Sequence, residues 1–320
     1  MDSGFTFSDE KFMRRALNLA AMGAGHVSPN PMVGAVIVAP DGRIIGEGFH
    51  RRYGGPHAEV NAFASVHDED TRLFADSTIY VSLEPCSHYG KTPPCALLLV
   101  EKGIGRCVIA TPDPNPKVSG RGCKILREAG IKVEIGLLEE EARSLNKRFM
   151  TSQIKRRPWI QLKWARSADG FIAPPADAPR VTFSTPGTLA LMHRERAMTD
   201  AIMVGTQTLI ADNPSLTTRL WPGNSPRPVL FATPRLLELL ETRKDEFTIF
   251  RREPILLDPG LPLEENMSRL FSEFKVTSLM VEGGRQLLQS FINAGLYDEM
   301  RIETASRKLG NGLSEPDIYF

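Results

Sequence analysis

The first half of this 320-residue chain alternates predicted strands with predicted helices, which restricts it to a layered α/β fold. An opening helix, capped by Ser8, has Phe12, Ala16, Leu19 and Ala20 on one face. The first two strands form a hairpin around the turn Pro40-Asp41-Gly42. The predicted strands cover 33–38, 43–48, 77–83, 106–111 and 132–135, and later helices cover 58–66, 95–101 and 122–129.

A second α/β unit follows a change in composition. Residues 139–158 are charged and polar, as expected for a solvated helix that leads into a linker, so we expect domains at 1–150 and 151–320. In the second domain the predicted strands cover 159–165, 201–204, 229–232 and 278–281, and the predicted helices cover 188–198 and 285–294.

Charge and cysteine content narrow the functional classes. The formal net charge is +1, which argues against a protein that binds nucleic acid through a basic face. The chain has no apolar run long enough for a membrane span, and its first residues lack the features of a signal peptide. Its four cysteines suit a reducing, cytoplasmic setting better than a disulfide framework.

The residues around His57 predict a catalytic zinc site. His57-Ala58-Glu59 opens a helix, Cys86 follows a strand, and Cys95 begins the next helix. One imidazole and two thiolates leave the fourth tetrahedral position for water, whose pKa a bound zinc lowers to about 7. Glu59 stands where it can carry protons from this water to a departing amine. The pattern resembles the His-x-Glu and Pro-Cys-x-x-Cys signature of zinc nucleobase deaminases.

A purely structural zinc site is the alternative. Such a site normally has four protein ligands, and His88 is available as the fourth. The positions of Glu59 and Pro85 favour the catalytic interpretation. The two remaining cysteines, Cys107 and Cys123, are expected to be buried structural thiols.

The spacing of the two thiols carries a family resemblance. The segment reads Pro85-Cys-Ser-His-Tyr-Gly-Lys-Thr-Pro-Pro-Cys95, and this long insert resembles the bifunctional deaminase/reductase of riboflavin biosynthesis rather than the tRNA adenosine or cytidine deaminases. Further matches extend over nearly the whole chain: Asn30-Pro-Met-Val-Gly34, Gly48-Phe-His50, Asp113-Pro-Asn-Pro116, Lys163-Trp-Ala-Arg-Ser-Ala-Asp-Gly170, Ala211-Asp-Asn-Pro-Ser-Leu-Thr217 and Val281-Glu-Gly-Gly284.

The resemblance implies two consecutive reactions. The N-terminal domain, with one Zn²⁺, would remove the 2-amino group of a diaminopyrimidinone that carries a ribosylamino 5′-phosphate. The C-terminal domain would then reduce the ribosyl group to ribityl with NADPH. The implied α/β fold is a cytidine-deaminase-like three-layer domain followed by a dihydrofolate-reductase-like domain. We expect a cytoplasmic homo-oligomer that acts on a small phosphoribosyl pyrimidine, without a nucleic-acid or membrane partner.

In the deaminase half the resemblance assigns catalysis to Glu59 and substrate contacts to Asn30, His50, Lys91, Asp113 and Asn115. Asn30 and His50 would face the pyrimidine, because an amide offers a donor and an acceptor to a base edge. Lys91 and the loop of Asp113 and Asn115 would hold the ribose phosphate. Without the resemblance, these are ordinary turn, strand-end and loop residues.

In the reductase half the resemblance assigns two sets of residues. The NADPH contacts fall on Ala165, Thr182, Thr208, Asp212, Thr233, Gly283 and Gly284. The substrate contacts fall on Lys163, Arg196, Leu216, Arg219 and Glu282. Free amides at a helix N-terminus favour a pyrophosphate, which suits Gly283-Gly284, and Arg196 would pair with the 5′-phosphate. A Gly-Gly pair alone more often marks a plain turn.

The reductase half also departs from the family pattern. Residues 173–183 read APPADAPRVTF instead of a glycine- and serine-rich segment with a tryptophan, Ala168 replaces a leucine, and Ala232 replaces a common aspartate. One alternative is therefore a monofunctional pyrimidine deaminase with a non-catalytic reductase-like domain, which would release ammonia without oxidising NADPH. A nucleic-acid-binding or tRNA-editing protein is disfavoured by the balanced charge and by the long insert.

Overall fold

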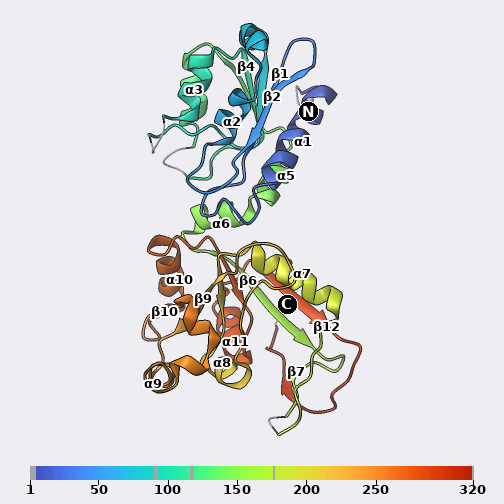
Figure 1. The fold of residues 1–320 in the computed structure, drawn as a ribbon, viewed down its shortest axis with the longest axis vertical. Coiled ribbons are helices and arrows are strands. Elements are labelled where there is room, and N and C mark those ends of the chain that lie inside the picture. Colours follow the sequence, from blue (N-terminus) through green and yellow to red (C-terminus); the bar gives the residue numbers. More distant parts are fainter. Residues whose placement is uncertain (1–4, 90–92, 116–118, 176, 319–320) are drawn as a thin grey trace. The chain divides into compact units, whose positions relative to one another are not determined.

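The structure is a computed structural model that describes residues 5–89, 93–115, 119–175 and 177–318. The chain divides into two units, Met1–Ile154 and Lys155–Phe320, each with its own sheet (Figure 1). The boundary expected at residue 150 falls inside helix α6 (Lys147–Lys155). Among the described residues, no helix is both long and apolar enough to cross a membrane.

A five-stranded sheet in the order β2-β1-β3-β4-β5 forms the middle of the N-terminal unit. β1 lies between β2 and β3 and pairs antiparallel with both, whereas the central β3 runs parallel to β4 and β5. The predicted hairpin is therefore present. The strands are β1 (Gly34–Val38), β2 (Ile44–Phe49), β3 (Thr78–Val81), β4 (Arg106–Ile109) and β5 (Lys132–Ile135).

Helices cover both faces of this sheet because alternate strand residues are apolar on each face. Val36 packs against α1 on one face, and Ile37 packs toward α2 on the other. The cap of α1 is Thr6, not Ser8 as expected, because Thr6 and Asp9 form a reciprocal capping box. The helices are α1 (Phe7–Ala21), α2 (Ala58–Ala64), α3 (Cys95–Lys102), α4 (Arg121–Glu128), α5 (Glu139–Leu145), α6 and the 3₁₀ helix η1 (Asp68–Asp76).

A six-stranded parallel sheet in the order β10-β9-β8-β11-β6-β12 forms the centre of the C-terminal unit. A separate short pair joins β7 to β13. Four of these strands, β7, β10, β12 and β13, were not predicted from the sequence. The strands are β6 (Trp159–Arg166), β7 (Phe171–Ala173), β8 (Ala201–Met203), β9 (Arg227–Phe231), β10 (Ile255–Leu257), β11 (Ser278–Val281), β12 (Glu299–Thr304) and β13 (Leu313–Ser314).

The two faces of this sheet differ in polarity. Leu162 and its apolar neighbours pack with α10 and α11, whereas Gln161 and Lys163 alternate onto the opposite face of β6. That second face is apolar around β8 and β9, where α8 and α9 cover it. The helices are α7 (Pro186–Ala197), α8 (Thr206–Asp212), α9 (Pro234–Thr242), α10 (Leu263–Ser272), α11 (Arg285–Asn293), η2 (Lys244–Glu246) and η3 (Thr248–Arg252).

Candidate active sites

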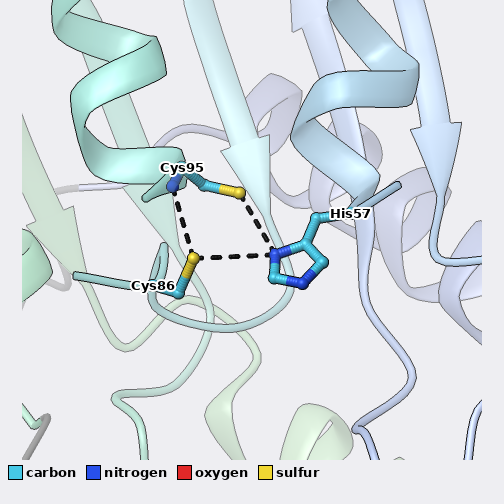
Figure 2. Close-up of side chains that lie close together, drawn as sticks. All are labelled: His57, Cys86 and Cys95. Carbon is cyan, nitrogen blue, oxygen red and sulfur yellow. Dashed lines mark hydrogen bonds between the residues drawn. The ribbon is translucent and has the colours of Figure 1, made fainter. Parts of the chain in front are cut away.

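Three potential metal ligands converge in the N-terminal unit, as the sequence predicted. His57 is the residue directly before α2, Cys86 follows β3, and Cys95 is the first residue of α3. Nδ1 of His57 lies 3.6 Å from Sγ of Cys86 and 3.3 Å from Sγ of Cys95 (Figure 2). The backbone N–H of Cys95 also donates to Sγ of Cys86 at 3.3 Å, which suits a thiolate.

These distances fit a zinc ion. Bonds of about 2.1 Å to nitrogen and about 2.3 Å to sulfur at tetrahedral angles place the two ligand atoms about 3.6 Å apart. The three ligand atoms lie within 4.8 Å of one another, and among the described residues no fourth histidine, cysteine or carboxylate joins them. His88 therefore does not complete a four-ligand structural site. Cys107 and Cys123 are buried away from this group in the core of the same unit.

Glu59 is a buried carboxylate beside the three ligands. It lies in the first turn of α2, two residues after His57, and is only 3% exposed. Burial raises the pKa of Glu59 to about 7, and the nearby Cys86 thiolate acts in the same direction. A carboxyl group with its pKa near neutrality can both take up and release a proton at physiological pH.

A pocket of about 240 Å³ opens onto this group. Asn30 and His50 lie together on its wall, since the Asn30 amide donates to Nε2 of His50 at 3.1 Å. The other ring nitrogen, Nδ1, lies 3.0 Å from the carbonyl oxygen of Pro56, which can only accept, so Nδ1 carries the proton. Burial lowers the pKa of His50, which favours this neutral form. The two predicted pyrimidine contacts thus lie side by side.

Asp113 and Asn115 line another part of the same pocket. Oδ1 of Asp113 accepts the backbone N–H of Asn115 at 2.8 Å, which closes a tight turn. Burial raises the pKa of Asp113, and the Glu84 carboxylate raises it further. Lys91, the third residue predicted to bind the ribose phosphate, lies outside the described residues.

Helix α6 contributes pocket residues that sequence reasoning missed. Phe149 and Gln153 line the pocket, although residues 139–158 were interpreted as a solvated helix and linker. Asn146, between α5 and α6, is 2% exposed and bonds to the backbone of Met32. The available signal was the apolar spacing of Ala142, Leu145 and Phe149 at i, i+3 and i+7 within that charged segment, which indicates helical structure with a buried face.

In the C-terminal unit, three predicted substrate residues form one buried group. Arg196 of α7 pairs with Glu282 through two hydrogen bonds, from Nε at 3.0 Å and from Nη2 at 2.6 Å. Lys163 of β6 lies near these two residues. Burial lowers the pKa of Lys163, whereas the negative charges of Glu282 and Glu303 raise it and so partly offset the effect of burial. The Arg196 guanidinium is thus paired with Glu282, and its expected contact with the 5′-phosphate stays a prediction.

Two glycine-containing turns meet beside this group. The backbone N–H of Gly205, at the start of α8, donates to the carbonyl oxygen of Gly283 at 2.8 Å. Gly284 is the residue directly before α11, and a Cβ added there would lie 3.1 Å from Oγ1 of Thr208. Gly283 has a φ of +113°, a conformation that favours glycine. Three predicted cofactor residues, Thr208, Gly283 and Gly284, are thus adjacent.

The other predicted reductase residues are more scattered. Ala165 lies two residues beyond Lys163 on β6. Thr233 is the N-terminal cap of α9, and its hydroxyl contacts that of Thr206. Asp212 is the exposed last residue of α8 and pairs with Arg180. Thr182 is exposed outside any helix or strand.

Leu216 and Arg219 differ in what they offer a substrate. The side chain of Leu216 is buried in the core, so any substrate contact of this residue falls to its backbone rather than its side chain. Arg219 is exposed, and its guanidinium is held by the hydroxyls of Ser215 and Thr217.

Comparison with known protein families matches each unit separately. A family described as "Cytidine and deoxycytidylate deaminase zinc-binding region" matches residues 7–111. A family described as "RibD C-terminal domain" matches residues 158–316.

Several curated proteins and solved structures are similar along almost the whole chain. "Riboflavin biosynthesis protein RibD" of Aquifex aeolicus is 36% identical, over 97% of this chain and 90% of that protein, and its Escherichia coli namesake is 35% identical over 95% and 89%. The crystal structure of a diaminohydroxyphosphoribosylaminopyrimidine deaminase/5-amino-6-(5-phosphoribosylamino)uracil reductase from Thermotoga maritima is 37% identical, covers 96% of this chain and 89% of that chain, and superposes with a TM-score of 0.83. These similarities confirm the expected fold class of a cytidine-deaminase-like domain followed by a dihydrofolate-reductase-like one.

Proposed function

Because the chain belongs to the RibD family of bifunctional riboflavin-biosynthesis deaminase/reductases, we propose that its two units catalyse successive steps on one pyrimidine. The N-terminal unit hydrolyses the 2-amino group of 2,5-diamino-6-ribosylamino-4(3H)-pyrimidinone 5′-phosphate. The C-terminal unit reduces the ribosyl group of the deaminated product to ribityl. The observation that carries the proposal is the convergence of His57, Cys86 and Cys95 beside the buried Glu59.

In the deaminase pocket, His57, Cys86 and Cys95 would hold zinc, which supplies Lewis-acid activation of water when bound. Glu59 takes the proton of the attacking water and delivers it to the departing amine, so that ammonia leaves neutral. Its burial keeps this proton away from bulk solvent.

The walls of the pocket orient the substrate. The Asn30–His50 pair faces the pyrimidine edge: Nε2 of His50 accepts from Asn30 and Nδ1 donates to the carbonyl oxygen of Pro56, so His50 fixes the orientation in which the Asn30 amide offers a donor and an acceptor. At the ribose phosphate end, the Asp113 carboxylate would accept from hydroxyl groups of the ribose, and the Asn115 side-chain amide would donate to the phosphate together with Lys91. Phe149 adds an apolar surface from α6.

The reductase unit offers a surface that fits a dinucleotide phosphate. Gly284 directly precedes α11, so the free N–H groups of that helix face the turn formed with Gly205, and the absence of side chains there lets a phosphate approach the backbone. We propose NADPH as the hydride donor, with Thr208 beside this turn, and Ala165, Thr182, Asp212 and Thr233 as further contacts.

The ribosyl end of the substrate would lie near Lys163 and Glu282. Arg196 positions Glu282 through its paired hydrogen bonds, and the half-buried ammonium of Lys163 can donate to a sugar oxygen. Arg219, beside the backbone of Leu216, would pair with the 5′-phosphate together with Arg196.

The test follows ammonia and NADPH separately in the zinc-loaded, full-length protein supplied with the diaminopyrimidinone ribosyl phosphate. Glu59→Gln should slow ammonia release by about 10²–10⁴-fold, the usual contribution of a general acid–base group. It should leave reduction of a supplied deaminated intermediate intact. The matched control Glu47→Gln removes a surface carboxylate that pairs with Arg15 and should change neither step. Ammonia release that survives Glu59→Gln unchanged would refute the catalytic assignment.

The same assay tests the second reaction. Ammonia release without NADPH oxidation would support a monofunctional deaminase with a reductase-like module, the alternative raised by residues 173–183 and Ala232.

We also propose that the protein is a cytoplasmic homo-oligomer. Sedimentation of the purified protein tests the oligomeric state, and a single species of monomer mass would refute oligomerisation.

A further inference from the structure

Glu84 is a buried carboxylate at the pocket wall whose role the reaction described above leaves unassigned. It follows β3, two residues before Cys86, and is 4% exposed. Its backbone N–H donates to the carbonyl oxygen of Thr111 at 3.0 Å, which fixes its main chain beside the end of β4. Its side chain therefore reaches the segment that follows β4.

That side chain accepts hydrogen bonds from three backbone N–H groups of the segment. Oε2 accepts from Asp113 at 3.2 Å and from Gly120 at 3.0 Å, and Oε1 accepts from Cys123 at 3.2 Å. The donors belong to the loop before α4 and to the first turn of that helix. A carboxylate with several backbone donors binds them more strongly than a neutral acceptor, and the loss of such a buried acceptor leaves the donors unsatisfied.

The segment held in this way is part of the pocket wall. Asp113 and Asn115 line the pocket together with Glu84. The first turn of α4 packs directly on the main chain of Pro85. Gly122 approaches so closely that a Cβ added to it would lie 2.1 Å from the carbonyl oxygen of Pro85, too short for any other residue type to fit without movement. Asp113, before the undescribed residues 116–118, and residues 120–123, after them, are thus both anchored at Glu84-Pro85.

We propose that Glu84 is a positioning residue, which holds Asp113 and Asn115 at the distance from the zinc ligands that the phosphoribosyl substrate requires. This inference rests on the proposed deaminase function. Glu84 acts through the loop and not through the ligands, so its loss should weaken substrate binding more than it slows the chemical step.

The experiment measures the kinetics of ammonia release by full-length, zinc-loaded protein. Glu84→Gln should raise KM about tenfold and change kcat less than about threefold, with zinc content unchanged. Glu84→Asp retains the charge and should have a smaller effect. The matched control Asp9→Asn removes another buried carboxylate that accepts a backbone N–H in the same unit, away from the pocket, and should leave KM unchanged.

A double-mutant cycle separates positioning from a general loss of structure. If Glu84 acts through Asp113, then Asp113→Ala should raise KM, and adding Glu84→Gln should raise it little further. Additive effects, an unchanged KM in Glu84→Gln, or an equal rise in Asp9→Asn would overturn the inference. A wild-type protein that releases no ammonia would instead refute the proposed function.

Hydrogen exchange tests the same contacts without any variant. The amides of Asp113, Gly120 and Cys123 should exchange slowly in the wild-type protein, because each donates to a buried carboxylate. Rapid exchange at all three amides would overturn the inference even if the Glu84 variants fail to fold.

Discussion

The side-chain amide of Asn146 exchanges two hydrogen bonds with the backbone of Met32. The Met32 N–H donates to Oδ1 of Asn146, and Nδ2 of Asn146 donates to the Met32 carbonyl oxygen, both at 2.8 Å. This pair joins the loop that carries Asn30 to the start of α6, which carries Phe149. Two residues that are 114 positions apart in the sequence thereby fix one wall of the deaminase pocket.

Asn146→Ala should weaken both the fold and the pocket. It leaves the N–H and the carbonyl oxygen of Met32 without their partners, which lowers the free energy of unfolding by about 1–3 kcal/mol for each group. The loss is smaller where a water molecule enters and bonds to the group in place of Asn146. We expect a lower free energy of unfolding and a higher KM for deamination. The matched control is Asn266→Ala in the C-terminal unit, where a buried amide donates to the carbonyl oxygen of Asp258. The control should lose stability without a change in that KM, and an unchanged KM in Asn146→Ala would contradict the interpretation.

Removal of zinc should separate the two activities. After dialysis against a chelator, ammonia release should stop, because His57, Cys86 and Cys95 are expected to hold the only ion that this reaction needs. NADPH oxidation with a supplied deaminated intermediate should continue. Added Zn²⁺ should restore ammonia release, and Cys86→Ser should lower the zinc content measured by atomic absorption. Loss of both activities on chelation would show that the reductase unit also depends on a metal.

Glu282→Gln should impair the reductase unit. Arg196 is 6% exposed, so the substitution leaves a buried guanidinium without its counter-charge, which typically costs about 3–5 kcal/mol. We expect destabilisation together with slower NADPH oxidation, while ammonia release persists. Glu246→Gln is the control, because its ion pair with Arg243 is exposed and worth at most about 1 kcal/mol. Equal stabilities of the two variants would contradict the buried-pair interpretation.

Asp9 should make the free energy of unfolding depend on pH in the acidic range. Burial alone would raise the pKa of Asp9, but hydrogen bonds from Arg106, the Thr6 backbone and Tyr80 outweigh burial and hold this pKa well below its usual range. The carboxylate therefore stabilises the folded state above the unfolded pKa of about 3.9, and the stabilisation is lost as the pH falls below that value.

Denaturant titrations of the wild type and of Asp9→Asn, at pH 6 and at pH 3, measure this contribution. The difference in unfolding free energy between the two proteins should be larger at pH 6 and should shrink at pH 3. Loss of zinc in acid affects both proteins alike and cancels in the comparison. A difference that is the same at both pH values would show that the Asp9 charge contributes nothing.

The sequence predicted the zinc ligands because each stands at an element boundary that local rules locate. His57 precedes a helix, Cys95 begins one, and the apolar run before Cys86 indicates a buried strand. The alternation of Val36 and Ile37 between two covered faces likewise follows from strand geometry. These features depend on residues close together in the chain, which a single sequence displays.

The supporting residues could not be predicted in this way. The hydrogen-bond donors to the Glu84 carboxylate lie at least 29 positions away, and nothing in the local sequence indicates which loop this carboxylate faces. β12 is an exception: its charged residues alternate with Met300 and Ile302, the pattern of a half-buried strand, so this strand was predictable from the sequence although it was missed. The pairing of Arg196 with Glu282 depends on the packing of α7, which no periodicity specifies.

The position of α6 has a consequence for any attempt to separate the two catalysts. Phe149 and Gln153 line the deaminase pocket, yet they are among the last residues before the second unit begins at Lys155. A gene fragment that stops at codon 145 would encode a deaminase with an open-sided pocket, and one that stops at codon 150 would still omit Gln153. We expect an active deaminase fragment to need the whole of α6. The two units can therefore be separated only after this helix, and not anywhere within the charged residues 139–158.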